Sequence, residues 1–443
     1  WEALYKLGIE AIPYIPERTS EGYGINAKSI EKFKPSTLIV TVDNGIVAHE
    51  AVEKANELGI DVIVTDHHTA HEKLPEAVAV VHTTETSGSG IAWLLARELG
   101  VESGLELVAL GVVADQIPLL GVNRSLVKFG LEELNRTRRV GLLKLMEEAG
   151  ISQGKLGTYE INFVIAPRIN AMGRLAEGMD SLRLLCTRSE ERAERLAGEL
   201  GRVNQERQLM VSEALLDSFE KVEDGGAVLV ASEKYHEGII GLIAAKLVEK
   251  YYRPAIVFAV GEKQVKASGR SIGGFNLYET VFQFREELEG GGGHPMAVGF
   301  TIKKNKMAVF EKEFQEAAKE LLTEEVLERS LRVDLEMGFG LIDWKLVAEL
   351  ERFEPCGLGN PKAVFCTRGV EVVENKTVGK EDKHIKLKLR EGKREYGAIG
   401  FGFGGLSKKI EKGDKIDVAF NLERNEWNGR ESIQLKIKDI KYE

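Results

Sequence analysis

Acidic and imidazole side chains follow two neighbouring β-rich runs of the sequence. Asp43 comes directly after the first run, and Asp66, His67 and His68 come directly after the second. Because parallel strands present their carboxyl ends at one edge of a sheet, we expect these four side chains to lie close together. Carboxylates combined with imidazoles suit Mn²⁺, Fe²⁺ or Zn²⁺ better than Ca²⁺. The pattern predicts a metal site, although Asp43 alone could equally be a polar cap for the following helix.

A third acid closes an apolar segment. Asp115 follows the run 107–113 and precedes Ile117-Pro118. A carboxylate in such surroundings is costly unless it is paired or bound to a metal, so Asp115 is a candidate ligand from a third element. The alternative is an acid exposed to water at the end of a helix.

Four consecutive glycines, 290–293, stand before His294. Glycine lets a backbone approach a phosphate closely enough for its amide groups to donate hydrogen bonds. Four glycines are more than a turn requires, so the run predicts a glycine-rich loop that contacts a phosphate. A flexible turn between a helix and a strand is the alternative.

The segments around these residues alternate between strand and helix patterns. Strands are predicted at 36–42, 60–65 and 77–82, with a helix at 48–58. This order predicts a parallel sheet with right-handed crossovers, and the continuous first run predicts a strand buried on both faces. Residues 121–185 are predicted to be mostly helical.

A long charged stretch then predicts a connecting helix that ends near Lys221. Thr187 and Glu190 form a capping-box pattern at its start. A second α/β unit follows, with strands at 227–231, 255–260, 264–267 and 296–302 and helices at 239–251, 277–288 and onward to 329. From residue 364 short alternating runs predict a small all-β barrel or sandwich.

The composition bounds the class of protein. The 443 residues imply several domains, and 43% hydrophobic with 29% charged residues excludes wholesale disorder. A net charge of −10 argues against polyanion binding over the whole surface, but residues 366–443 carry 18 Lys and Arg against 14 Asp and Glu. With Phe401, Phe403 and Trp427 available for stacking, that segment suits single-stranded nucleic acid. A solvated β-domain with core aromatics is the alternative.

Three scattered cysteines indicate a reducing compartment, and no apolar run is long enough for a membrane helix.

Several motifs together resemble a known family. Asp43-Asn44-Gly45, Asp66-His67-His68 and Ala114-Asp115 resemble the second, third and fourth motifs of the DHH phosphoesterases. Stretches at 16–24, 166–174, 268–271, 291–295 and 357–361 are similar to the RecJ-type 5′ exonucleases of that family, and the resemblance covers essentially the whole chain.

The resemblance implies an α/β fold class with four parts. These are a parallel-sheet DHH domain at 1–185, a long connecting helix at 186–221, a smaller α/β DHH-associated substrate domain at 222–329 and a C-terminal OB-like nucleic-acid-binding β-barrel at 330–443.

The implied activity is metal-dependent 5′-to-3′ hydrolysis of single-stranded DNA to mononucleotides, in DNA repair and recombination in the cytoplasm. Two divalent ions, Mn²⁺ or Mg²⁺, would stabilise the attacking and leaving oxygens. Asp43 would bridge the ions, and His67 and Asp115 would complete the shell of one of them. His68 would face the substrate phosphate, and Asp66 would orient a histidine.

The resemblance also implies substrate-binding residues. Arginine suits phosphate because its planar fork donates two hydrogen bonds at once. The pocket for the terminal 5′-phosphate would comprise Arg18, Arg174, Ser268 and Arg270, and Arg168 matches nearly as well as Arg174. Tyr23 would stack on a terminal base, and Gly292, Gly293 and His294 would contact the nucleotide. The implied partners are single-stranded DNA and a single-strand-binding protein or helicase. The resemblance further implies a monomer that does not bind a membrane.

One departure from the family pattern leaves alternatives open. The family's first motif, a strand with Asp-x-Asp, should precede the helix that opens at Trp1, and it is absent from the sequence. We therefore expect an incomplete metal site and poor hydrolysis by the chain as given. One alternative is a DHH phosphodiesterase for short oligoribonucleotides or cyclic dinucleotides. Another is a non-catalytic DNA-binding relative, against which the retained Asp43, His67, His68 and Asp115 argue.

Overall fold

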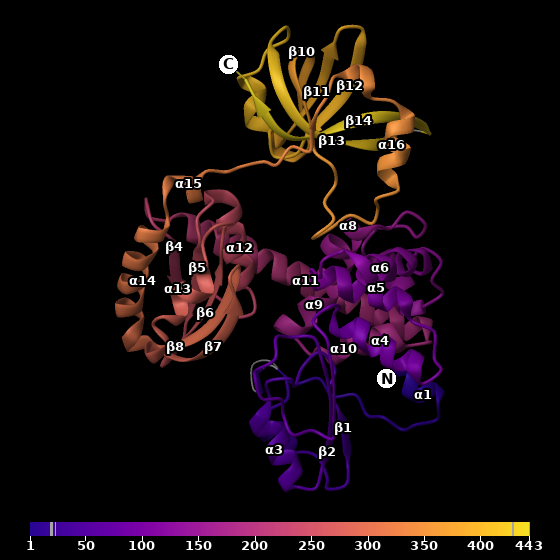
Figure 1. Cartoon of the computed structure of the whole chain (residues 1–443), viewed down its shortest axis with the longest axis vertical. Helices are drawn as coiled ribbons and strands as arrows, with labels where there is room; N and C mark the ends of the chain where they lie inside the picture. Colours follow the sequence, from indigo (N-terminus) through magenta and orange to yellow (C-terminus); the bar gives the residue numbers. More distant parts are fainter. Residues whose placement is uncertain (18–20, 23, 428, 443) are drawn as a thin grey trace. The chain divides into compact units, whose positions relative to one another are not determined.

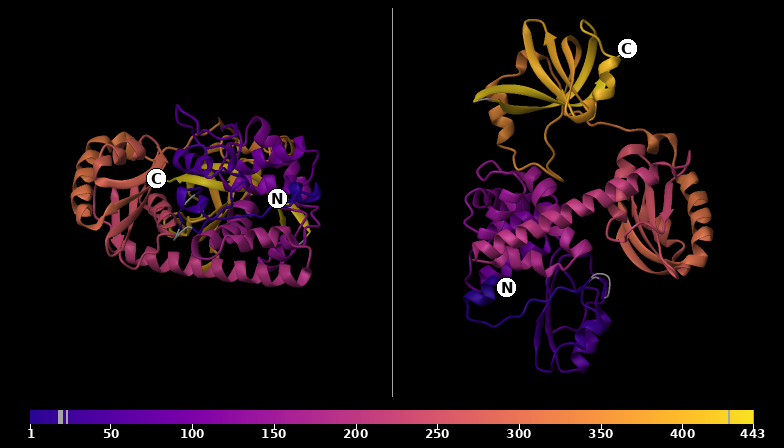
Figure 2. Two further views of the ribbon diagram at one scale, coloured as in Figure 1. Left: turned by 90° about the horizontal axis from the view of Figure 1, so that it is seen from below. Right: turned by 180° about the vertical axis from the view of Figure 1, so that it is seen from behind.

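A computed structural model describes residues 1–17, 21–22, 24–427 and 429–442 (Figures 1 and 2). It divides into two compact units, which we describe separately. The first unit comprises residues 1–82, 94–102 and 134–329, and the second comprises residues 83–93, 103–133 and 330–443. Among the helices in these ranges, none is both long and apolar enough to cross a membrane.

The first unit begins with a three-stranded parallel sheet, as the sequence predicts. Its order is β1 (Leu38–Val40), β2 (Asp61–Asp66) and β3 (Ala79–His82). Helices α2 (Ala27–Ile30) and α3 (His49–Glu57) pack against it, and the short α1 (Glu2–Lys6) precedes them.

The expected burial of the first strand on both faces is wrong. Ile39 packs beside the core formed by α2, α3 and β2, but Leu38 is 56% exposed and Val40 is also exposed. A continuous apolar run favours a strand, but it does not determine whether both faces of that strand are buried. In the described residues, other elements pack against only one face of β1.

Helices then connect the sheet to the rest of the first unit. They are α7 (Val140–Glu148), α8 (Thr158–Glu160), a π-helical turn (Ile161–Ile165), α9 (Ala166–Leu175), α10 (Met179–Cys186) and α11 (Glu190–Phe219). The predicted connecting helix is α11, the long helix in the right view of Figure 2. Its N-cap is Ser189, whose side chain accepts from Arg192 N at 3.2 Å. The prediction that Thr187 caps this helix is therefore wrong, because Thr187 ends α10 and accepts from Ser189 N instead.

A five-stranded mixed sheet completes the first unit. Its order is β4 (Val228–Ser232), β5 (Ala255–Val260), β6 (Gln264–Arg270), β8 (Ala297–Lys303) and β7 (Leu288–His294), with only β4 and β5 parallel. One face packs on α11 and α12 (Ile240–Tyr251). The other face packs on α13 (Leu277–Phe282), α14 (Met307–Leu321) and α15 (Glu324–Leu327).

The glycine run lies in the edge strand β7, so its prediction as a loop is wrong, and the helix predicted at 277–288 ends at Phe282. The strand needs glycine at alternate positions. A Cβ at Gly291 would lie 2.6 Å from the carbonyl oxygen of Gly299, and one at Gly293 would lie 2.3 Å from that of Ala297. Without side chains, β7 can approach the backbone of β8 this closely.

The second unit contains helices and the predicted barrel. The helical part comprises the first half of α4 (Gly88–Glu98), α5 (Leu105–Ala114) and most of α6 (Gly121–Leu134). The C-terminal part comprises β9 (Leu335–Glu336), α16 (Trp344–Glu351), β10 (Phe365–Val378), β11 (His384–Glu391), β12 (Arg394–Gly400), β13 (Lys415–Trp427) and β14 (Arg430–Lys441). Strands run in the order β11-β12-β14-β13-β10, and β10 pairs with β11 again, so five strands close a barrel. The barrel surrounds a core that includes Phe339, Val370, Phe420 and Leu435.

Candidate metal centre and anion site

Three side chains gather at the carboxyl ends of β1 and β2. The ligand atoms of Asp43, His67 and His68 all lie within 4.8 Å of one another. Nε2 of His67 is 2.9 Å from Oδ1 of Asp43. One carboxylate and two imidazoles form a donor set that suits Mn²⁺ and related divalent ions, so the residues fit a metal.

The backbone at Asp43 is in an unusual conformation. Its φ is +66°, in the left-handed region that residues other than glycine rarely occupy. Its amide donates to the carbonyl oxygen of Thr65 at 3.0 Å, and Asn44 forms a β-bridge with the same residue. The bridge to β2 therefore holds a conformation that costs free energy and aims the carboxylate at His67. Strain of this kind is frequent at functional sites.

Asp66 is buried and acts as the acceptor for the turn that carries the histidines. Its carboxylate accepts from the amides of Ile46 at 3.0 Å, His67 at 2.7 Å and His68 at 3.2 Å, and from Nδ1 of His68 at 2.7 Å. Burial acts to raise the pKa of Asp66, but these hydrogen bonds outweigh it and bring the pKa to about 2. Asp66 is therefore ionised at neutral pH and orients the ring of His68.

His68 is fixed from two sides. Its Nδ1 donates to Asp66, and its carbonyl oxygen accepts from Nε2 of His82 at 2.7 Å. With Nδ1 engaged, Nε2 is the atom through which His68 could reach a metal or a phosphate.

Two other groups of predicted residues are not placed against this centre. Asp115 lies at the C-terminal end of α5, in the second unit, so its role as a metal ligand stays a prediction. Arg18 and Tyr23 lie outside the described residues, so their roles stay predictions.

A second cluster in the first unit consists of cations. Nη1 of Arg174 donates to the carbonyl oxygen of Gly238 at 3.1 Å, and Nη1 of Arg270 donates to Gly269 O at 2.7 Å and Ser268 Oγ at 3.3 Å. Burial lowers the pKa of both guanidinium groups, and the charge of Arg174 lowers that of Arg270 further. Among the residues described, no carboxylate forms an ion pair with either, so the pair lacks a counter-charge.

Arg168, which the sequence could not separate from Arg174, has different surroundings. Its Nε donates to Glu148 Oε2 at 2.7 Å, and its Nη1 donates to the carbonyl oxygen of Val164. Because Glu148 already neutralises Arg168, the structure favours Arg174 as the phosphate contact.

The sequence did not reveal the segment that adjoins this cluster, at residues 238–241. A Cβ at Gly238 would lie 2.6 Å from the carbonyl oxygen of Arg174, and one at Gly241 would lie 3.0 Å from Ser268 Oγ and 3.1 Å from Arg270 Nη2. The available signal was Gly238, between a predicted strand and a predicted helix, together with Gly241 near the start of that helix.

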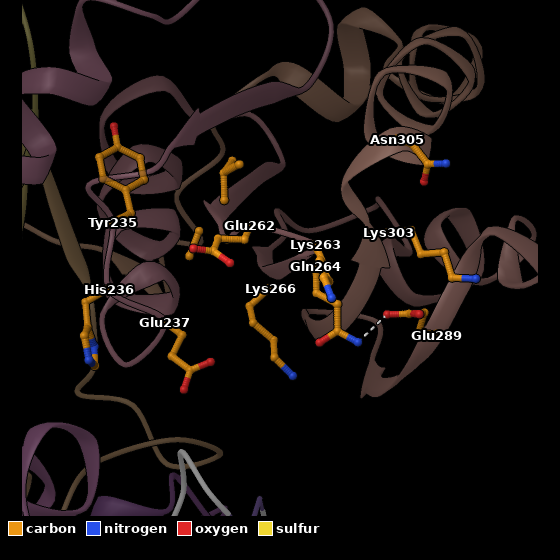
Figure 3. Close-up of a pocket in the computed structure, with 13 residues that line it drawn as sticks. Tyr235, His236, Glu237, Glu262, Lys263, Gln264, Lys266, Glu289, Lys303 and Asn305 are labelled. Carbon is orange, nitrogen blue, oxygen red and sulfur yellow. Dashed lines mark hydrogen bonds between the residues drawn. The ribbon is translucent and has the colours of Figure 1, made fainter.

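A groove opens at the ends of β4 and β5 beside that loop (Figure 3). It has a volume of about 920 Å³, and His236 and Glu237 stand at one side of it. Lysines and glutamates line it in similar numbers, namely Lys263, Lys266, Lys303, Glu237, Glu262 and Glu289. Such mixed charge does not make a uniform track for a polyanion.

The remaining predicted contacts lie on exposed surfaces. Strand β7, with Gly292 and His294, is exposed over most of its length, and a Cβ at Gly292 would meet nothing within 4 Å. On the barrel Phe401 is 55% exposed, with Nζ of Lys436 5.6 Å from the ring centroid. Phe403 packs against the barrel core instead, and the side chain of Trp427 lies outside the described part.

Comparison with known proteins gives consistent matches. Family models match the DHH family N-terminal domain at residues 1–112, the DHHA1 domain at 224–323 and the RecJ OB domain at 333–439. The chain is 37% identical to the single-stranded-DNA-specific exonuclease RecJ of Bacillus subtilis (strain 168), over 98% of this chain and 58% of that protein. It is 30% identical to the protein of the same name from Salmonella typhimurium, over 98% of this chain and 83% of the relative.

A solved structure agrees with the sequence matches. The crystal structure of RecJ from Thermus thermophilus in complex with Mn²⁺ superimposes with a TM-score of 0.84 at 30% identity. The match covers 100% of this chain and 66% of that one. The chain spans little more than half the length of the Bacillus subtilis relative.

Proposed function

Because the chain belongs to the RecJ family of DHH phosphoesterases, we propose that it is a metal-dependent exonuclease that degrades single-stranded DNA from the 5′ end and releases mononucleotides. The observation that supports this most directly is the convergence of Asp43, His67 and His68 in one site. Arg174 and Arg270, which are partly buried and form no ion pair with a carboxylate within the described part of the chain, would supply the second element, a place for a terminal phosphate.

The metal centre would carry the hydrolysis. Asp43 and His67, with Asp115 as the predicted further ligand, would hold Mn²⁺ or Mg²⁺. Bound ions of this kind lower the pKa of a water and stabilise charge on phosphate oxygens. Asp66 holds the His68 ring through Nδ1, so that Nε2, on the other side of the ring, is the atom that would face the substrate phosphate.

Direction along the strand would come from recognition of its end. A terminal phosphate monoester carries more charge than an internal diester and offers three free oxygens. Arg174, Ser268 and Arg270, together with Arg18 in the proposal, would bind it by charge-assisted hydrogen bonds. Seating the end there would place the first internal diester at the metal centre.

The other parts would hold the strand that follows. Gly292, Gly293 and His294 on β7 would contact the nucleotide, Tyr23 would stack on the terminal base, and the barrel would bind single-stranded DNA. The four domains keep their predicted bounds in this proposal. A cytoplasmic role in DNA repair and recombination, as a monomer that works with a single-strand-binding protein or helicase, completes it.

Release of label from strands marked at either end tests the proposal. The assay uses the full-length gene product with Mn²⁺, because the chain spans only part of its Bacillus subtilis relative. Asp43→Ala should abolish release, since it removes a ligand. Arg270→Ala should reduce cleavage of 5′-phosphorylated strands by roughly tenfold to a hundredfold, from the loss of a charge-assisted hydrogen bond, and affect 5′-hydroxyl strands far less.

Two results would contradict the proposal. Early release of label from the 3′ end would exclude 5′-to-3′ direction. Equal loss on both kinds of strand would exclude end recognition by Arg270 and would favour hydrolysis of short oligonucleotides instead.

A further inference from the structure

The connecting helix α11 carries a guanidinium that the proposed function does not use. Arg207 is partly buried, and its Nη2 donates to Asn204 Oδ1 at 3.0 Å. Its Nε is fully buried and has no hydrogen-bond partner among the described residues. A buried N–H group without an acceptor costs free energy, so the Arg207 guanidinium is poorly compensated by the residues described around it.

Arg207 shares its surroundings with the two arginines of the anion site. Burial lowers the pKa of Arg207, and the positive charge of Arg174 lowers it further, as it does for Arg270. The three come from different elements, α11, α9 and β6, and α11 packs against both α9 and α12. Within the described ranges none of the three forms an ion pair with a carboxylate. Three partly buried like charges in one neighbourhood are unfavourable without an anion.

The N-terminus of α12 adds positive potential at the same place. Its first turn begins at Ile240, and its N-cap, Ile239, has no side-chain oxygen to bond the free amides. Gly241, in that first turn, lies against Ser268 and Arg270. A helix N-terminus without a side-chain cap favours an anion, and here it adjoins cations that need one.

We propose that Arg207 is a further guanidinium of the pocket for the terminal 5′-phosphate, in addition to those of Arg18, Arg174 and Arg270, and that it strengthens the preference for a terminal monoester over an internal diester. The inference rests on the proposed function and adds a residue that lies outside the sequence motifs and that neither of the other arginines contacts by a hydrogen bond described above. A terminal phosphate carries a charge of about −1.5 to −2 at pH 7, against −1 for a diester. The additional positive charge of Arg207 is therefore better compensated by the monoester.

Binding of short ligands without hydrolysis tests the inference. The probes are a thymidine dinucleotide with a 5′-phosphate and the same dinucleotide with a 5′-hydroxyl, titrated by calorimetry in the presence of EDTA. Arg207→Met keeps the apolar stem and removes the charge. It should weaken binding of the phosphorylated probe by roughly tenfold to a hundredfold and change binding of the hydroxyl probe by less than about threefold.

Arg202→Met is the matched control. Arg202 lies on the same helix, is exposed, and pairs with Glu199 and Glu206, so its loss should leave the binding of both probes unchanged. The thermal midpoint of the ligand-free protein should stay the same or rise in Arg207→Met, because a charge that repels Arg174 is removed.

The outcomes separate this inference from the proposed function. If Arg207→Met keeps the wild-type preference for the phosphorylated probe while Arg174→Met loses it, the inference is wrong and the pocket stands. If Arg174→Met and Arg270→Met also keep the preference, the pocket itself is wrong. If Arg207→Met lowers the ligand-free midpoint, the same binding measurement is made with Arg207→Gln. A folded Arg207→Gln protein that has lost the preference for the phosphorylated probe supports the inference. A folded Arg207→Gln protein that keeps this preference overturns it.

Discussion

At the scale of single residues, Asp66 determines how the histidines of the candidate metal centre are presented. It is the buried acceptor of three backbone amides and of the His68 ring. A protonated or neutral side chain there could not accept all four bonds, so the turn that follows β2 depends on the negative charge.

Asp66→Asn should lower the free energy of unfolding at pH 7 by about 2 kcal/mol. This is the stabilisation that corresponds to a pKa lowered from 3.8 to about 2 in the folded state. Because the pKa is lower in the folded state, this stabilisation is fully present above the unfolded-state pKa and is lost as the pH falls toward 2. Urea unfolding of both proteins should therefore show a difference that shrinks below about pH 4.

Asp61→Asn provides the control, since Asp61 is exposed at the other end of β2. It should change the free energy of unfolding by less than about 0.5 kcal/mol. A difference between wild type and Asp66→Asn that stays constant down to pH 3 would contradict the stabilising role of the ionised carboxylate.

The sequence predicted the clustering of Asp43, His67 and His68 better than it predicted the surroundings of the arginines. Asp43 and His67 follow strands, and the edge of a parallel sheet brings strand ends together whatever the details of packing. Arg168 and Arg174, by contrast, lie in one motif and differ only in what surrounds them. Glu148, which pairs with Arg168, comes from a helix whose position no local pattern reveals.

At the scale of elements, β7 shows how close packing fixes the identity of residues in a strand. Glycine is a weak strand former, so the sequence pattern favoured a loop at 290–293. The strand forms because its pairing with β8 leaves no room for a Cβ at Gly291 and Gly293. Pattern alone could not reveal this, since the constraint comes from a neighbouring backbone.

Gly293→Ala should therefore destabilise the five-stranded sheet, by about 1–3 kcal/mol, because its methyl group would overlap the backbone of β8. Gly292→Ala is the matched control in the same strand, where a Cβ meets open space. Its effect on the thermal midpoint should be small. Equal midpoints for the two variants would show that the close approach of β7 to β8 is not the reason for the glycines.

At the scale of the whole chain, charge is distributed unevenly. The net charge is −10, while residues 366–443 have more basic than acidic side chains. Composition predicted this segment as a site for nucleic acid but could not tell which aromatic rings face solvent. The barrel core takes Phe403, and Phe401 stays exposed beside Lys436 on β14 and His384 at the start of β11.

Phe401 and Lys436 should contribute to single-strand binding in two separable ways. Stacking of a base on an aromatic ring is worth about 1–3 kcal/mol and releases no counterion, so Phe401→Ala should lower affinity equally at low and high salt. A lysine that contacts a phosphate releases a counterion on binding. Lys436→Ala should therefore reduce the slope of log affinity against log salt by about 0.7 and weaken binding most at low salt.

Fluorescence anisotropy of a labelled oligothymidine, measured over a range of salt concentrations, distinguishes the two contributions. Phe353→Ala is the control, because Phe353 is an exposed ring that precedes the barrel strands. It should leave both affinity and slope unchanged. Unchanged affinity in Phe401→Ala and an unchanged slope in Lys436→Ala would together mean that this face of the barrel does not carry the strand. The counterions released by the wild-type protein would then come from contacts that neither variant removes, either on another surface of the barrel or at the proposed arginine pocket.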